Sequence, residues 1–206
     1  MEEAWLAIRY GASALGLVSE MPSGPGVISE ERIAEIAASV PPGVATFLLT
    51  SQREAATIVA QQKRCRTNTL QLVERVSHAT LQELRAALPG IALVQVIHVR
   101  SRSSVNEAES VAPYVDAILL DSGNPDLAVK QLGGTGRTHD WTLSRQIRER
   151  VPVPVYLAGG LRAENVGEAV RQVTPFGVDV CSGVRTDGRL DESRLKRFVA
   201  ALGEYR

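Results

Sequence analysis

The sequence has 206 residues, 44% of them hydrophobic and 22% charged, a composition typical of one globular domain. Its 23 basic and 23 acidic residues balance, so no long-range field favours nucleic acid or an anionic membrane as a partner. Two cysteines exclude a disulfide framework, and no apolar run reaches the roughly 20 residues of a membrane span. With no signal peptide at the N-terminus, we expect a cytoplasmic protein with a single domain over residues 1–206.

Short apolar runs alternate with amphipathic runs along the chain, starting with a helix that ends at Gly11. Two serines, Ser29 and Ser51, are predicted to be N-caps of the next two helices. Strands are predicted at 14–18, 44–49, 69–73, 91–99, 117–120, 153–157 and 178–181. Helices are predicted at 2–10, 29–39, 51–62, 80–88, 104–110, 140–149, 163–173 and 191–202.

This alternation of about seven short strands with helices predicts an α/β protein with a parallel sheet. Two arrangements are compatible with it, an open doubly wound sheet and a closed barrel. The strand count, the chain length and the loop chemistry favour a parallel (β/α)8-type TIM barrel. In such a barrel the functional residues lie at the carboxyl ends of the strands.

Two glycine-bearing turns follow the last two predicted strands. Gly159 and Gly160 come after one, and Ser182 and Gly183 come after the other. Backbone amides that no Cβ screens can approach a phosphate closely, and the late loops of barrels often share one phosphate site. Either turn alone could be a tight connection that needs glycine. The two in succession predict a phosphate-binding site.

Asp121 directly follows the predicted strand at 117–120. A carboxylate at that position points into the mouth of a barrel, where it can transfer a proton at a sugar carbon or ring oxygen. The other interpretation is a turn former, because Ser122 and Gly123 come next. Asp121 is therefore a candidate catalytic residue.

Other polar residues give weaker signals. Gly133 and Gly134 begin a glycine-rich loop suited to closing over a ligand, or simply to linking two elements. His98 ends a predicted strand and could face the mouth. Of the cysteines, Cys65 lies between two arginines and is expected to be a surface thiol, whereas Cys181 is expected to be buried.

Four ordered motifs bring a family into view: VDAILLDS at 115–122, GGTGRTHDW at 133–141, LAGGL at 157–161 and GVDVCSGV at 177–184. In order and spacing they resemble the phosphoribosylanthranilate isomerase family of tryptophan biosynthesis, and ASALGLV at 12–18 looks like that family's second strand. The similarity is strong over the second half of the chain and fainter, but colinear, over the first.

The resemblance implies an Amadori rearrangement, in which a phosphoribosyl amine is opened and a proton is moved to give an enol-ketose phosphate. No metal or other cofactor is implied. Asp121 matches the family's general acid. Gly159, Gly160, Ser182 and Gly183 match its phosphate site, so the implied partner is a phosphorylated small molecule.

Three departures from the family pattern accompany this match. The family opens with a strand carrying a Lys-Ile-Cys-Gly motif, whose Cys is the general base, and this sequence starts at what corresponds to the first helix. Gly26 stands where the family has an Arg that helps to hold anthranilate, and QLVE at 71–74 replaces Gln-Leu-His-Gly. We therefore expect a barrel without its first strand, a homodimer or distorted sheet that covers the open edges, and a loss of about 10²–10⁴-fold in proton abstraction.

Two further hypotheses stay open beside the named isomerase. One is a relative that binds a phosphorylated metabolite without turnover, or that needs a partner chain to complete its site. The other is a phosphosugar epimerase, aldolase or isomerase that uses a different base.

Overall fold

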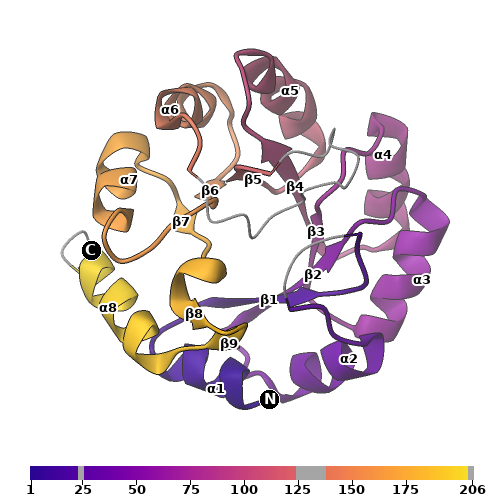
Figure 1. The fold of residues 1–206 in the computed structure, drawn as a ribbon. Helices are drawn as coiled ribbons and strands as arrows, with labels where there is room; N and C mark the ends of the chain where they lie inside the picture. Colours follow the sequence, from indigo (N-terminus) through magenta and orange to yellow (C-terminus); the bar gives the residue numbers. More distant parts are fainter. Residues whose placement is uncertain (23–25, 124–137, 204–206) are drawn as a thin grey trace.

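The computed structural model describes residues 1–22, 26–123 and 138–203. Within these ranges, seven strands form one parallel sheet in which each strand pairs with the next along the chain (Figure 1). Such an order requires every crossover to be made by the helix between two neighbouring strands. The strands are β1 (Ala14–Val18), β2 (Ala45–Thr50), β3 (Thr69–Leu72), β4 (Ala92–His98), β5 (Ala117–Asp121), β6 (Val155–Leu157) and β7 (Gly177–Val178).

The helices form a ring outside the curled sheet (Figure 1). None of those in the described parts of the chain is long and apolar enough to cross a membrane. They are α1 (Glu2–Arg9), α2 (Glu30–Ser39), α3 (Ala55–Cys65), α4 (His78–Ala87), α5 (Ser103–Val111), α6 (Trp141–Arg150), α7 (Val166–Val173) and α8 (Glu192–Gly203), with short 3₁₀ turns η1 (Ala112–Tyr114) and η2 (Ser182–Val184).

Hydrophobic side chains pack on both faces of the sheet, as the period of a strand requires. Leu48 and Ile118 belong to the larger cluster, which includes the buried helix residue Ile58 and therefore lies between sheet and helices. Phe47 and Leu119, their neighbours in the strands, belong to a smaller cluster inside the curl. This two-layer core confirms the α/β barrel architecture predicted from the sequence.

Element boundaries differ from prediction where a hydrogen-bond donor or a partner strand is missing. β6 starts at Val155 because Pro154 has no N–H to give to a ladder. β7 ends at Val178, since it pairs only with β6, itself a short strand. The predicted cap Ser51 is wrong: α3 begins at Ala55, and the Ser51 hydroxyl donates to the carbonyl oxygen of Glu20 at 3.4 Å.

The sheet is open on one side. β1 and β7 are its two ends, and no strand in the described ranges lies between them. Helix α1 and the small hairpin of β8 (Arg185–Thr186) and β9 (Arg189–Leu190) lie at this side (Figure 1). The Glu3 carboxylate accepts from Arg185 at 2.8 Å and from the Leu190 N–H at 3.0 Å. Side-chain contacts, rather than strand pairing, therefore join the two ends of the ring.

Candidate active site

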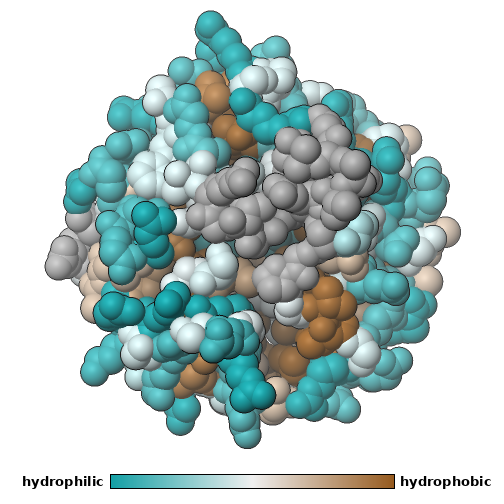
Figure 2. All heavy atoms as spheres, in the orientation of Figure 1, coloured by the Kyte–Doolittle hydropathy of each residue, from teal (hydrophilic) through white to brown (hydrophobic). Residues whose placement is uncertain are grey.

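The carboxyl ends of all seven strands in the described residues meet at one end of the curl, because the strands are parallel. Figure 1 looks onto this mouth. Figure 2 shows the same face, with a predominantly hydrophilic rim and hydrophobic atoms between the positions of β1 and α2. In β/α barrels this is the end that carries the functional groups.

Asp121 is the last residue of β5 and is only 6% exposed. Burial raises the pKa of its carboxyl group above the usual range, and the N–H groups of Ser122 and Gly123 offset part of that rise. The Gly123 N–H donates to Asp121 Oδ2 at 3.3 Å. A carboxyl group in this setting keeps its proton to higher pH than a solvated aspartate does.

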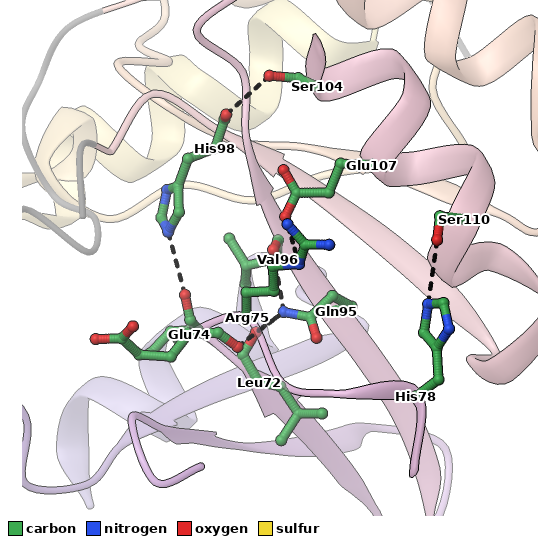
Figure 3. A network of polar contacts seen from close by, with 11 residues as sticks. Leu72, Glu74, Arg75, His78, Gln95, Val96, His98, Ser104, Glu107 and Ser110 are labelled. Carbon is green, nitrogen blue, oxygen red and sulfur yellow. Dashed lines mark hydrogen bonds and ion pairs between the residues drawn. The ribbon is translucent and has the colours of Figure 1, made fainter. Parts of the chain in front are cut away.

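His98 ends β4 and is paired in register with Asp121. Its Nδ1 lies 3.9 Å from Asp121 Oδ2, and its Nε2 lies 3.1 Å from the carbonyl oxygen of Val73. Figure 3 shows this ring on one side of β4 and Gln95 on the other. Gln95 Nε2 donates to the carbonyl oxygens of Leu72 and Glu74, both at 3.0 Å. Two side chains of β4 thus hold the turn after β3 from opposite faces.

The turn after β6 adopts a backbone that favours glycine. Gly159 and Gly160 have φ values of 83° and 64°, in the left-handed region. A Cβ on Gly159 would lie 2.8 Å from the backbone nitrogen of Ser122, so this turn packs directly against the end of β5. Asn165 then fixes the loop, since its Nδ2 donates to the Gly160 carbonyl at 3.0 Å and its Oδ1 accepts from the Arg162 N–H at 2.8 Å.

The turn after β7 lies against the turn after β6. A Cβ added to Gly183 would meet the carbonyl oxygen of Leu161 at 1.9 Å, a distance that no side chain can occupy. Ser182 and Gly183 lie in η2, the short 3₁₀ turn that follows β7 along the chain. The two predicted phosphate-binding turns are therefore in contact with each other and with the Asp121 segment.

Asp179 is a titratable group at the mouth that the sequence analysis did not single out. It directly follows β7, and its side chain reaches solvent although protein atoms surround it on most sides. Burial, and then the negative charge of Asp121, raise the pKa of Asp179 to about 6. Asp179 carries the same sequence signal as Asp121, an aspartate at the end of a strand. The alternating GVDV pattern made Asp179 look like a residue inside the predicted strand.

The remaining residues named in the sequence predictions have different outcomes. Gly133 and Gly134 lie outside the described residues. The expected surface thiol is wrong, because Cys65 is fully buried and burial raises its pKa to about 11. Cys181 is half-buried rather than buried. His139 bonds to the Ser144 hydroxyl at 2.7 Å, and burial lowers its pKa to about 4, so this ring is neutral near pH 7.

The fold and the mouth together define a (β/α)-barrel protein with a buried carboxyl group, beside an imidazole, at the ends of its central strands. A family model described as N-(5'phosphoribosyl)anthranilate (PRA) isomerase matches residues 3–201. The chain belongs to this family, as the four motifs predicted.

Relatives match over most of their length. The N-(5'-phosphoribosyl)anthranilate isomerase of Methanocella arvoryzae is 34% identical over 196 residues, which cover 95% of this chain and 90% of that protein. The Haloferax volcanii enzyme of the same name is 39% identical over 193 residues, covering 93% of this chain and 83% of that protein.

Solved structures of phosphoribosyl anthranilate isomerases superpose on nearly the whole of this chain. Phosphoribosyl anthranilate isomerase from Thermotoga maritima superposes with a TM-score of 0.81 at 29% identity, covering 98% of this chain and 94% of that one. A phosphoribosyl anthranilate isomerase in complex with reduced 1-(o-carboxyphenylamino)-1-deoxyribulose 5-phosphate gives a TM-score of 0.81 at 26% identity, covering 98% and 93%.

Proposed function

We propose that this chain acts in tryptophan biosynthesis as a phosphoribosylanthranilate isomerase, an aldose–ketose isomerase of the cytoplasm. The observation that carries the proposal is the buried, paired carboxyl group of Asp121 at the mouth of a barrel that belongs to this family. The reaction opens a phosphoribosyl amine and moves one proton. A carboxyl group that keeps its proton can supply the first of these steps.

In this proposal Asp121 is the general acid. It gives its proton to the furanose ring oxygen as the bond from that oxygen to the anomeric carbon breaks. A base then removes the proton from the neighbouring sugar carbon, which leaves the enol of the ketose product. A positioned acid of this kind contributes about 10²–10⁴-fold to the rate.

Backbone amides of Gly159, Gly160, Ser182 and Gly183 are proposed to hold the substrate phosphate. The contact between these two turns supports this assignment, because a single anion can only be shared by loops that lie together. Gly133 and Gly134 are proposed to take part in binding the substrate. The substrate is therefore a phosphorylated small molecule, and neither a metal nor another cofactor is needed.

A second copy of the chain is proposed to cover the open side. Three large hydrophobic side chains in the described residues are exposed: Trp5 at 40%, Val27 at 46% and Phe176 at 69%. Trp5 lies on α1, Val27 bridges Val18 at the free edge of β1, and Phe176 directly precedes β7. Exposed apolar side chains next to unpaired strand edges favour an interface. Sedimentation of the wild type and of Phe176→Ser tests this, because a monomeric wild type contradicts it.

An altered relative, which converts or binds another phosphosugar, is the alternative. It is favoured by Glu74 and Gly26, which depart from the family pattern. Complementation of a tryptophan auxotroph that lacks this isomerase separates the two. Growth supports the named reaction. Failure by well-folded protein, together with thermal stabilisation by other phosphosugars, supports the alternative.

A further inference from the structure

The imidazole of His98 shares the buried position of Asp121. The two residues pair across β4 and β5, His98 Nδ1 lies 3.9 Å from Asp121 Oδ2, and each side chain is 8% exposed. In the described structure this Nδ1 is buried and has no hydrogen-bond partner. A buried ring nitrogen without a partner normally lowers the free energy of unfolding. Its orientation toward a carboxyl group therefore indicates a functional role for the pair.

The Val73 carbonyl fixes which ring nitrogen carries the hydrogen. Nε2 lies 3.1 Å from this oxygen. A carbonyl oxygen only accepts, so Nε2 must donate and keeps its hydrogen in every protonation state of the ring. The lone pair of the neutral ring is then on Nδ1, the nitrogen that faces Asp121.

Burial decides how many protons the pair holds. With none, the pair carries a net charge of −1, and with two it carries +1. With one proton it is neutral overall, whether the proton is on the carboxyl oxygen or on Nδ1. Removal from water penalises both charged states, so one proton is the favoured occupancy.

We propose that His98 and Asp121 hold one proton between them, and that His98 is a positioning residue which keeps this proton available to Asp121. The assignment of that proton to the substrate ring oxygen rests on the proposed function, but the sharing is a property of the resting protein. In the reaction the Asp121 O–H bond breaks and an O–H bond forms on the former ring oxygen. The pair then takes one proton back from solvent before the next turnover.

Other charged groups follow the strands that end at the same mouth. Glu74 follows β3 and Arg100 follows β4, whereas Asp179, which follows β7, interacts electrostatically with Asp121. The tests below therefore compare variants in which these three groups are unchanged.

Nitrogen-15 spectra of the imidazole rings test the sharing without any need for catalysis. The sequence has three histidines, and His98→Gln assigns the one that matters. We expect the neutral His98 ring to carry its hydrogen on Nε2. Asp121→Asn should move the titration of this ring to lower pH by about one unit, because a carboxylate that shares its proton is lost. Hydrogen on Nδ1, or a titration that Asp121→Asn leaves unchanged, overturns the proposal.

The pH dependence of kcat/KM tests the consequence for the isomerase. His98→Gln keeps a donor for the Val73 carbonyl and removes the ring that shares the proton. The limb at which activity falls with rising pH should then move to lower pH, by roughly half a unit or more, because Asp121 alone loses its proton sooner than the pair does. A limb that stays in place, or moves to higher pH as removal of a fixed cation would require, contradicts the proposal.

Gln95→Leu is the matched control. It loosens the same turn after β3 from the opposite face of β4, where its amide binds the carbonyls of Leu72 and Glu74, and it leaves the His98–Asp121 pair intact. For Gln95→Leu, the pH at which kcat/KM falls should stay at the wild-type value. A shift equal to that of His98→Gln would show that both substitutions act through the turn, and this would overturn the proposal. If wild type lacks isomerase activity, the proposed function fails, whereas the nitrogen-15 spectra still decide the sharing.

Discussion

The closed and open sides of the curled sheet place an aspartate at the end of a strand in very different surroundings. On the closed side β5 has a neighbour on each edge, and Asp121 at its end is 6% exposed. On the open side β7 has one neighbour, and Asp179 reaches solvent. Both have a raised pKa, the first chiefly from burial, the second from burial reinforced by Asp121. Strand pairing on both edges therefore creates the more completely desolvated carboxyl group.

The largest expected effect is a loss of catalysis from a substitution on the closed side of the sheet. Asp121→Asn removes the proposed acid and should lower kcat by about 10²–10⁴-fold, with little change in stability, since asparagine keeps the size of the side chain. Steady-state kinetics and chemical denaturation measure the two. The control is Asp187→Asn in the hairpin, where φ is 49° and asparagine fits well. Equal activity of Asp121→Asn and wild type would remove the acid assignment.

Next in size is a change where the two turns meet. Gly183→Ala places a methyl group 1.9 Å from the Leu161 carbonyl oxygen, so the backbone must shift. We expect the free energy of unfolding to fall by about 3 kcal/mol and stabilisation by inorganic phosphate to be lost. Gly43→Ala is the control, because its Cβ would meet no atom within 4 Å. A Gly183→Ala protein as stable as Gly43→Ala would contradict the observed contact.

A smaller effect, on the pH dependence of stability, is expected at Asp179 on the open side. The pKa of Asp179 is raised to about 6, so the native state binds its proton more tightly than the unfolded state does, and this contribution to stability is lost as pH rises through 6. Asp179→Asn should therefore raise the melting temperature at pH 7 and change it little near pH 4. The gain should not exceed about 1 kcal/mol, because solvent screens this side chain. A larger gain at pH 4 than at pH 7 would reverse the assigned sign.

The smallest effect concerns the contacts that join the ends of the ring. Glu3→Gln weakens the ion pair with Arg185, which lies 2.8 Å away, and should cost below about 1 kcal/mol. Added salt should reduce the difference, because it screens the wild-type pair. Glu2→Gln on the same helix is the control. Thermal melts at low and high salt measure both, and a cost that grows with salt would exclude an ion-pair origin.

How far the sequence predicts this molecule depends on how local the cause is. The strands from β1 to β5 and the position of Asp121 at the end of β5 were predictable, because buried runs and a polar residue at their ends are local patterns. Cys65 was assigned to the surface, since the arginines beside it hid its position on the buried face of α3. The pairing of His98 with Asp121 needed the register of β4 against β5, which no spacing along the chain supplies.

The sheet order also has a consequence for folding. Each strand pairs with the one made just before it, so loop closure between neighbours is short, and the β/α units can form in the order of synthesis. The contacts of Glu3 with Arg185 and Leu190, which are 182 and 187 residues away, must wait until nearly the entire polypeptide has left the ribosome. Closing the ring is then the last step of assembly.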